Sequence, residues 1–115
     1  MEQESEAVIL RIYTGEATQY EGKPLYKYLV ELFRREHVAG CSVLRGIDGF
    51  GKTSHVHTTS ILRLSTDLPV VVEVVDKEEN IERIKPLLDG VVTEGLVTEQ
   101  RVNILLYEGK KPNAT

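Results

Sequence analysis

Residues 70–88 read VVVEVVDKEENIERIKPLL, and they carry the strongest structural signals in the chain. The first six are five valines and one glutamate, which predicts a buried strand because β-branched side chains favour extended backbone. Asp76 is expected to cap a helix, since its carboxylate can accept from the backbone N–H of Glu79 while Glu79 reaches back. Pro86 is expected to kink or end that helix early, because an interior proline removes a hydrogen bond. The apolar positions of the helix are Ile81, Ile84 and Leu88.

The N-terminal part of the chain predicts a strand, a helix and a second strand. Residues 7–14 read AVILRIYT, with the β-branched and aromatic content of a strand, and residues 15–22 are expected to form a loop. A helix is expected over residues 24–37, with Pro24 in its first turn, where a missing N–H loses no partner. Residues 41–45 predict the second strand. The core stripe of the helix is Leu25, Leu29, Leu32 and Phe33.

The remaining segments are less regular. Residues 46–60 hold three glycines and no clean hydrophobic period, which predicts a long loop, and residues 61–64 are a candidate for a short strand. Residues 90–101 are expected to be mostly loop, and residues 102–107 the last strand. The polar residues 108–115 are expected to be disordered.

The predicted order, strand-helix-strand-strand-helix-strand, is that of a ferredoxin-like split βαβ fold. We therefore expect one α+β domain over residues 7–107, a ferredoxin-like βαββαβ fold in which two helices cover one face of a four-stranded antiparallel sheet. Residues 1–6 are expected to be a flexible N-terminus and residues 108–115 a disordered tail. A chain of 115 residues fits one such domain.

The composition excludes several classes of protein. Apolar residues make up 41% of the chain, enough for a core, and 14 basic against 18 acidic residues give a net charge of −4, so nucleic acid is not an expected partner. The single cysteine, Cys41, excludes an internal disulfide framework and is expected to pack as a small hydrophobic residue. No apolar run approaches the roughly 18 residues of a membrane helix, so no direct membrane insertion is expected. The acidic residues 1–6 are unlike a signal peptide, and the expected location is cytoplasmic.

Strand alternation divides the predicted sheet into two faces that are both apolar. Helices on one side leave the second face uncovered, whereas a wet antiparallel face normally alternates apolar with polar residues. We expect burial of that face in a homo-oligomer; scattered surface apolarity is the alternative. The core face is predicted to hold Val8, Leu10, Ile12, Val70, Val72, Val74, Val102, Ile104 and Leu106. The opposite face is predicted to hold Ile9, Tyr13, Leu44, Val71, Val75, Leu105 and Tyr107.

Residues 46–53, GIDGFGKT, match the P-loop pattern G-x-x-x-x-G-K-[ST]. A P-loop lysine is followed at once by a helix, whereas residues 54–60, SHVHTTS, favour extended or turn structure. A flexible glycine hairpin is the simplest alternative. Basic side chains outnumber acidic ones around the loop, however, and glycine N–H groups beside cations predict a phosphate site that is not a P-loop. The cations are Arg45, Lys52 and Arg63, against the single acid Asp48.

Three further motifs carry a family resemblance. Residues 20–26 read YEGKPLY, residues 43–46 read VLRG before the GFG of residues 49–51, and residues 61–69 read ILRLSTDLP. Together they resemble an uncharacterised family of PII-like (GlnB-like) proteins over roughly residues 7–107. The resemblance implies a homotrimer whose long loop corresponds to the PII T-loop. It also implies an adenine nucleotide (AMP, ADP or ATP) in clefts between subunits, and regulation of a partner protein, such as a membrane transporter, without catalysis.

The resemblance implies a ligand site at the base of the T-loop. Residues 89–95 correspond to a PII loop that helps to hold phosphate, but Glu94 stands between Gly90 and Gly95 where PII proteins have a glycine-rich basic signature. Lys23, before the first helix, is expected to be a solvated lysine, with phosphate contact as the alternative. The residues that match the T-loop base are Arg45, Gly46, Gly49, Phe50, Gly51 and Lys52.

Two other functions stay open from the sequence. His55 and His57 are two residues apart, so on a strand they would share one face and, with Asp48, would suit a divalent-metal-binding or metal-tolerance protein of related fold. A metal site needs three or four ligands, so no metal requirement is expected. The second alternative is a small nucleotide hydrolase that uses Lys52 in the glycine loop, with Thr53 on magnesium.

Overall fold

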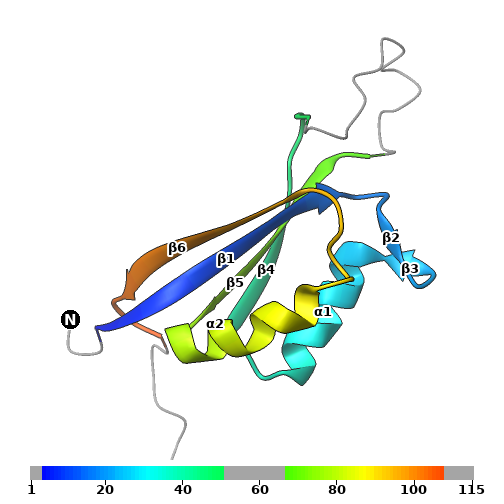
Figure 1. The fold of residues 1–115 in the computed structure, drawn as a ribbon. Helices are drawn as coiled ribbons and strands as arrows, with labels where there is room; N and C mark the ends of the chain where they lie inside the picture. Colours follow the sequence, from blue (N-terminus) through cyan, green and yellow to red (C-terminus); the bar gives the residue numbers. More distant parts are fainter. Residues whose placement is uncertain (1–3, 51–66, 108–115) are drawn as a thin grey trace, which may run out of the picture.

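The computed structural model describes residues 4–50 and 67–107 (Figure 1). The expected strand over residues 61–64 and the expected tail 108–115 lie outside the described residues. No helix in the described ranges is long and apolar enough to cross a membrane. The elements are β1 (Ser5–Gly15), β2 (Gln19–Tyr20), β3 (Lys23–Pro24), α1 (Leu25–Arg35), β4 (Gly40–Arg45), β5 (Pro69–Asp76), α2 (Glu78–Ile84), the 3-10 helix η2 (Lys85–Leu88) and β6 (Leu96–Ile104).

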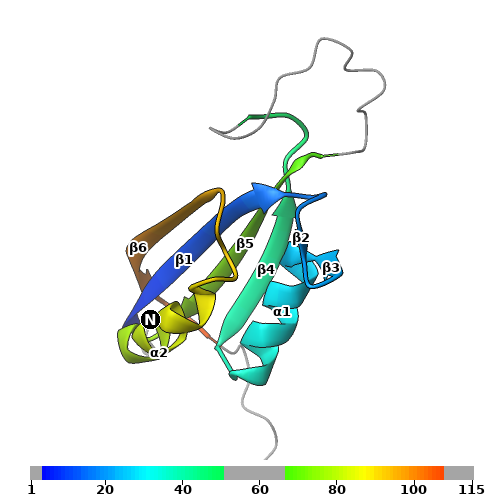
Figure 2. The same cartoon turned by 45° about the vertical axis from the view of Figure 1, so that its right-hand side comes forward.

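Four strands form one antiparallel sheet in the order β4-β5-β1-β6, with β1 and β5 in the centre. Both helices lie on the same side of this sheet (Figures 1 and 2). The register places Ile12 of β1 opposite Val72 of β5 and Val97 of β6. This arrangement confirms the predicted α+β fold with two helices over one face of a four-stranded antiparallel sheet.

The core lies between the helices and the central strands. Phe33 and Leu29 of α1 and Ile81 and Ile84 of α2 are fully buried. Burying a side chain of this size stabilises the fold by about 1.5–3 kcal/mol, so this layer accounts for much of the apolar stabilisation. The strand positions predicted for the core face and found buried are Val8, Leu10, Ile12, Val70, Val72 and Val74.

The prediction for the last strand is wrong. Residues 90–101 were expected to be mostly loop, but β6 begins at Leu96 and ends at Ile104, before the predicted end. β6 is an edge strand and is largely exposed, so polar residues are tolerated in it. These polar residues interrupt the apolar pattern by which a strand is predicted. Val102 pairs with Ala7, and Ile104 pairs with Ser5. Both therefore lie on the face of the sheet away from the helices, which we call the open face, and not on the core face. Leu106 lies beyond the strand and is exposed.

The start of α2 also differs from the prediction. Its N-cap residue is Lys77, without a side-chain capping bond, so the capping box between Asp76 and Glu79 does not form. Asp76 is instead the last residue of β5 and is 5% exposed. The expected effect of Pro86 is confirmed, because α2 ends at Ile84 and continues only as a 3-10 turn.

Smaller differences concern the segment before α1. The predicted loop over residues 15–22 contains half of a two-stranded hairpin, β2–β3, whose turn residues Glu21 and Gly22 have positive φ angles of 49° and 83°. Pro24 is the N-cap residue of α1 and not part of its first turn. These short elements bring the hairpin against α1, where the rings of Tyr20 and Tyr28 are 4.6 Å apart.

Candidate functional site

The candidate site lies where the segment between β4 and β5, predicted to be a long loop, leaves the sheet. We call residues 45–50 together with 67–69 the loop base. The backbone N–H of Gly46 donates to the carbonyl of Pro69 at 2.7 Å, which extends the β4–β5 pairing by one step. The N–H of Glu16 donates to the carbonyl of Leu68 at 2.8 Å, and the N–H of Ala17 donates to Asp67 Oδ1 at 3.2 Å. The loop base is therefore held to the end of β1 as well as to its own strands (Figure 2).

Two of the predicted glycines pack against one proline ring. A Cβ atom at Gly46 would lie 2.8 Å from Pro69 Cγ, closer than packed atoms allow. A Cβ atom at Gly49 would lie 3.3 Å from the same atom, and Gly49 has a φ of +149°, which side chains rarely adopt. The N–H of Gly49 donates to Asp48 Oδ1 at 2.8 Å. Gly46 and Gly49 thus fit the chain closely around Pro69.

Of the cations predicted for the site, Arg45 lies within the described residues. The sequence did not predict its partner. Its Nη2 atom forms an ion pair with the carboxylate of Glu16, 29 residues earlier in the chain. The Arg45 side chain is 59% exposed and the Glu16 side chain 21%. No local pattern links these two residues, because only the pairing of the sheet brings the ends of β1 and β4 together.

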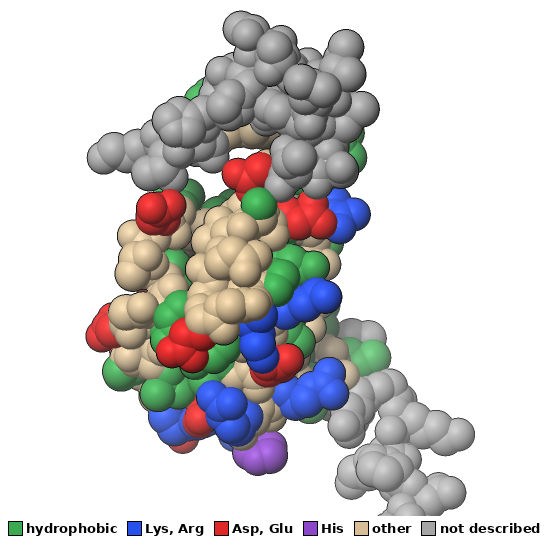
Figure 3. Space-filling model, turned by 90° about the vertical axis from the view of Figure 1, so that its right-hand side faces the viewer, with side chains coloured by type: hydrophobic (Ala, Val, Ile, Leu, Met, Phe, Trp, Pro, Cys, Tyr) green, Lys and Arg blue, Asp and Glu red, His purple; other side chains and the backbone are tan. Residues whose placement is uncertain are grey.

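The described part of the loop base has more acidic side chains around it than the count over residues 45–63 suggested. Glu16 forms an ion pair with Arg45, while Asp67 and Asp48 accept hydrogen bonds from the backbone N–H groups of Ala17 and Gly49, so three described carboxylates lie in this region. Figure 3 shows acidic side chains at this end of the described part of the molecule. A phosphate bound at this place would meet carboxylates as well as a guanidinium.

The other predicted site residues differ in where they lie. Phe50 is 80% exposed, as is its neighbour Ile47 at 94%, so both side chains project from the loop base. Gly51 and Lys52 lie outside the described residues, and so does the histidine pair of the metal alternative. Among residues 4–50 and 67–107 no group of three metal-ligating side chains comes together.

Two other side chains weighed from the sequence are Lys23 and Cys41. Lys23 Nζ lies 2.8 Å from Glu31 Oε1, and this hydrogen bond from Lys23 holds the pKa of Glu31 below its usual value. Cys41 is half-buried in β4, and burial raises the pKa of its thiol. Lys23 is thus a surface lysine, and Cys41 packs against the hydrophobic core, as expected for both.

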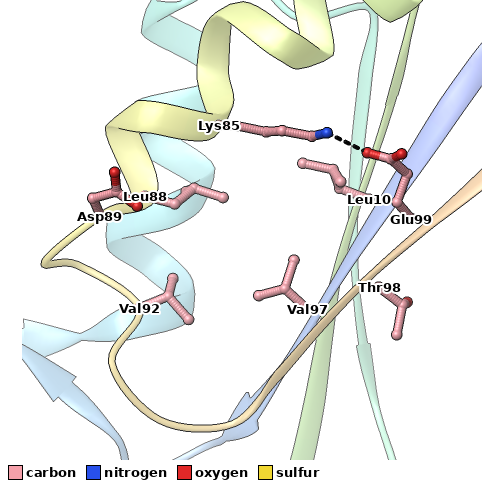
Figure 4. Close-up of a pocket in the computed structure, with 8 residues that line it drawn as sticks. All are labelled: Leu10, Lys85, Leu88, Asp89, Val92, Val97, Thr98 and Glu99. Carbon is pink, nitrogen blue, oxygen red and sulfur yellow. Dashed lines mark ion pairs between the residues drawn. The ribbon is translucent and has the colours of Figure 1, made fainter.

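A shallow groove of about 330 Å³ runs between η2 and β6 (Figure 4). Its floor is apolar, and an ion pair between Lys85 and Glu99, 2.5 Å apart, crosses one end. The sequence interpretation missed this groove because it treated the first half of β6 as loop. The lining residues are Leu10, Lys85, Leu88, Asp89, Val92, Val97, Thr98 and Glu99.

The open face of the sheet carries a polar centre within an apolar surface. Arg11 Nε lies 2.8 Å from Glu73 Oε2, and Arg11 Nη1 donates to Gln100 Oε1 at 2.7 Å. Apolar side chains surround these residues on all four strands, as predicted for most of them. They include Ile9, Tyr13, Leu44, Val71, Val75, Leu96 and Val102.

Residues 7–104 match the family DUF190, described as "Uncharacterized ACR, COG1993". The chain belongs to the DUF190 family. It is 40% identical over 97 residues to a UPF0166 protein of Aquifex aeolicus (strain VF5), a match that covers 84% of this chain and 91% of that protein. It is 42% identical over 92 residues to a UPF0166 protein of Methanocaldococcus jannaschii, which covers 79% of this chain and 84% of that protein.

Solved structures of a PII-like protein share the fold of this DUF190 chain. CPII from Thiomonas intermedia K12, bound to ADP and bicarbonate, aligns with a TM-score of 0.57 at 16% identity, over 89% of this chain and 91% of that one. CPII bound to ADP, AMP and bicarbonate aligns with a TM-score of 0.56 at 15% identity, with the same coverage. At such identities the likeness shows the fold. The family match confirms the predicted resemblance to an uncharacterised family, and these structures confirm that its fold is the PII-like one.

Proposed function

We propose that this DUF190 protein is a PII-like regulator. In this proposal it forms a homotrimer through the open sheet face and binds an adenine nucleotide in clefts between subunits, beside the loop base. It acts in the cytoplasm on a partner protein, with a membrane transporter as one candidate, and has no catalytic turnover. The nucleotide is AMP, ADP or ATP.

The observation that carries the proposal is the position of Arg45. Arg45 is the last residue of β4, where the predicted T-loop begins, and its side chain is more than half exposed. A guanidinium at such a place suits the oxygens of a phosphate, which it can contact through two parallel N–H groups. Supporting it, CPII of the same fold binds ADP and AMP.

The homotrimer is supported by the open sheet face. The face is apolar around Arg11 and Glu73, and within the described residues no helix covers it (Figures 1 and 2). A contiguous apolar surface of this kind on a small domain is typical of an interface. The proposal requires that this association bring the loop bases of neighbouring subunits near each other, so that a cleft forms between them.

Calorimetric titration with AMP, ADP and ATP tests the proposal. Arg45→Ala and Lys52→Ala are each expected to weaken binding by about tenfold or more, the usual cost of losing a charge-assisted hydrogen bond, without lowering the melting temperature. Arg34→Ala is the matched control, because it removes an exposed cation from the far end of α1. Unchanged binding in both site variants would move the site away from the loop base. Magnesium-dependent hydrolysis that is lost in Thr53→Ala would establish the hydrolase instead.

A further inference from the structure

Glu16 forms an ion pair with Nη2 of Arg45, the guanidinium that the proposed site offers to a phosphate. Its backbone is fixed, because its N–H donates to Leu68 at 2.8 Å and the next N–H, of Ala17, donates to Asp67. Its side chain is mostly covered, at 21% exposed, while that of Arg45 is 59% exposed. The Glu16 carboxylate is therefore attached to hydrogen-bonded backbone and largely covered, and the more exposed Arg45 side chain extends to it.

Carboxylate and phosphate compete for the same donors of an arginine, because both present oxygens that fit its planar fork. We infer that Glu16 is an internal competitor: it holds Arg45 in the ligand-free protein, and a nucleotide phosphate binds only by displacing it. This inference rests on the proposed function and deepens it, since it names the residue that sets the affinity of the site.

The other carboxylates of the loop base are engaged differently. Asp48 accepts from the N–H of Gly49 at 2.8 Å, and Asp67 accepts from the N–H of Ala17 at 3.2 Å. Both of these contacts stabilise the backbone of the loop base. Among the described residues, the ion pair of Arg45 is with Glu16. Removing the charge of Glu16 should therefore release Arg45, whereas removing the charge of Asp67 should not.

The expected effect is modest and measurable. An ion pair with one partner so exposed shifts a competing equilibrium by about two- to fivefold. Glu16 also repels the incoming anion, and this repulsion disappears in Glu16→Gln. We expect Glu16→Gln to tighten binding by about three- to tenfold. The gain should be larger at low salt, since salt screens both contributions.

The experiment is a titration of ADP, and separately of AMP, into five forms of the full chain. These are the wild type, Glu16→Gln, Asp67→Asn, Arg45→Ala and the double variant Glu16→Gln/Arg45→Ala. Asp67→Asn keeps its acceptor oxygen and serves as the control for lost negative charge. The inference expects tighter binding in Glu16→Gln, a clearly smaller gain in Asp67→Asn, which removes a charge without releasing Arg45, and no gain from Glu16→Gln once Arg45 is absent.

Each outcome separates the inference from the proposed function. If the wild type binds and Arg45→Ala weakens binding while Glu16→Gln leaves it unchanged, the proposed function stands and the internal competitor is overturned. An equal gain in Asp67→Asn, or a gain that persists without Arg45, overturns it too, because the effect is then general electrostatics. Binding that appears only in Glu16→Gln supports it. Absence of binding in all forms overturns both.

Discussion

The carboxylate of Asp76 accepts a hydrogen bond from the backbone N–H of Ala39 at 3.0 Å, which joins the end of β5 to the turn before β4. The same carboxylate accepts from the N–H of Lys77 at 2.7 Å and from Nδ2 of Asn80 at 3.0 Å. On the other side of the turn, the hydroxyl of Tyr107 donates to the carbonyl of Ala39 at 2.9 Å. Asp76 therefore connects three segments at the end of the sheet opposite the loop base.

Asp76→Ala is expected to lower the free energy of unfolding by about 2–3 kcal/mol, since a buried carboxylate is lost and its donors are left without their acceptor. Urea unfolding followed by circular dichroism measures the change. Asp89→Ala is the matched control, because Asp89 is exposed, and it should stay within about 0.5 kcal/mol of the wild type. Equal losses in the two variants would contradict the role given to Asp76.

The turn before β6 supplies a second prediction, from a pair of glycines. Gly95 has a φ of +108°, and a Cβ atom there would lie 2.2 Å from the carbonyl oxygen of Tyr13. Gly90 has a φ of +78° and open space around it. Gly90→Ala should cost about 1–2 kcal/mol of backbone strain, and Gly95→Ala at least about 1 kcal/mol more, because backbone must move. Equal unfolding midpoints for the two variants would refute the close approach to β1.

A third prediction concerns the open sheet face and the proposed trimer. Val71 lies on this face, opposite Tyr13. Light scattering of the wild type should give a mass near three chains, and Val71→Asp should reduce it to one, because an unpaired charge is costly to bury. Leu87→Asp, on η2 at the helix side, is the control and should keep the wild-type mass. A wild-type protein that is monomeric at micromolar concentration would exclude this interface.

The central strands were predictable because their side chains obey one strong rule. Residues of β1 and β5 alternate toward a buried core, so their apolar pattern is complete, and the stripe of α1 follows for the same reason. The first half of the edge strand β6 was not predicted, because its exposed residues form ion pairs and do not show the apolar pattern of a buried strand. Arg101 pairs with Glu78 at 3.0 Å and Glu99 with Lys85, and neither partner is near in sequence.

The candidate site was predictable only in part, for a related reason. The glycines around Arg45 mark a close turn, which is a local property of the chain. The partner of Arg45 depends on the order of strands, so Glu16 looked like an ordinary residue of the loop after β1. The local charge was misjudged accordingly, since Glu16 is far from Arg45 in sequence but pairs with it in the fold, and Asp67 accepts from the N–H of Ala17, next to Glu16.

The last prediction concerns acid stability. Hydrogen bonds from Lys23 and from Arg101 hold the pKa values of Glu31 and Glu78, respectively, below the ordinary value of 4.5. Each carboxyl thus has a lower pKa in the folded than in the unfolded chain, so the unfolded chain binds more protons in the acidic range. Stability from these pairs is complete above about pH 4.5 and is lost as the pH falls through the folded values.

Urea midpoints measured from pH 6 to pH 3 should therefore fall less in Arg101→Gln than in the wild type, since the variant has already lost one pair. Arg34→Gln is the control, because it changes the net charge equally but leaves Glu78 paired. Both members of the pair are exposed, so added salt should reduce the difference between the variants. Parallel curves for Arg101→Gln and the wild type at low salt would show that the ion pair with Glu78 contributes nothing to acid sensitivity.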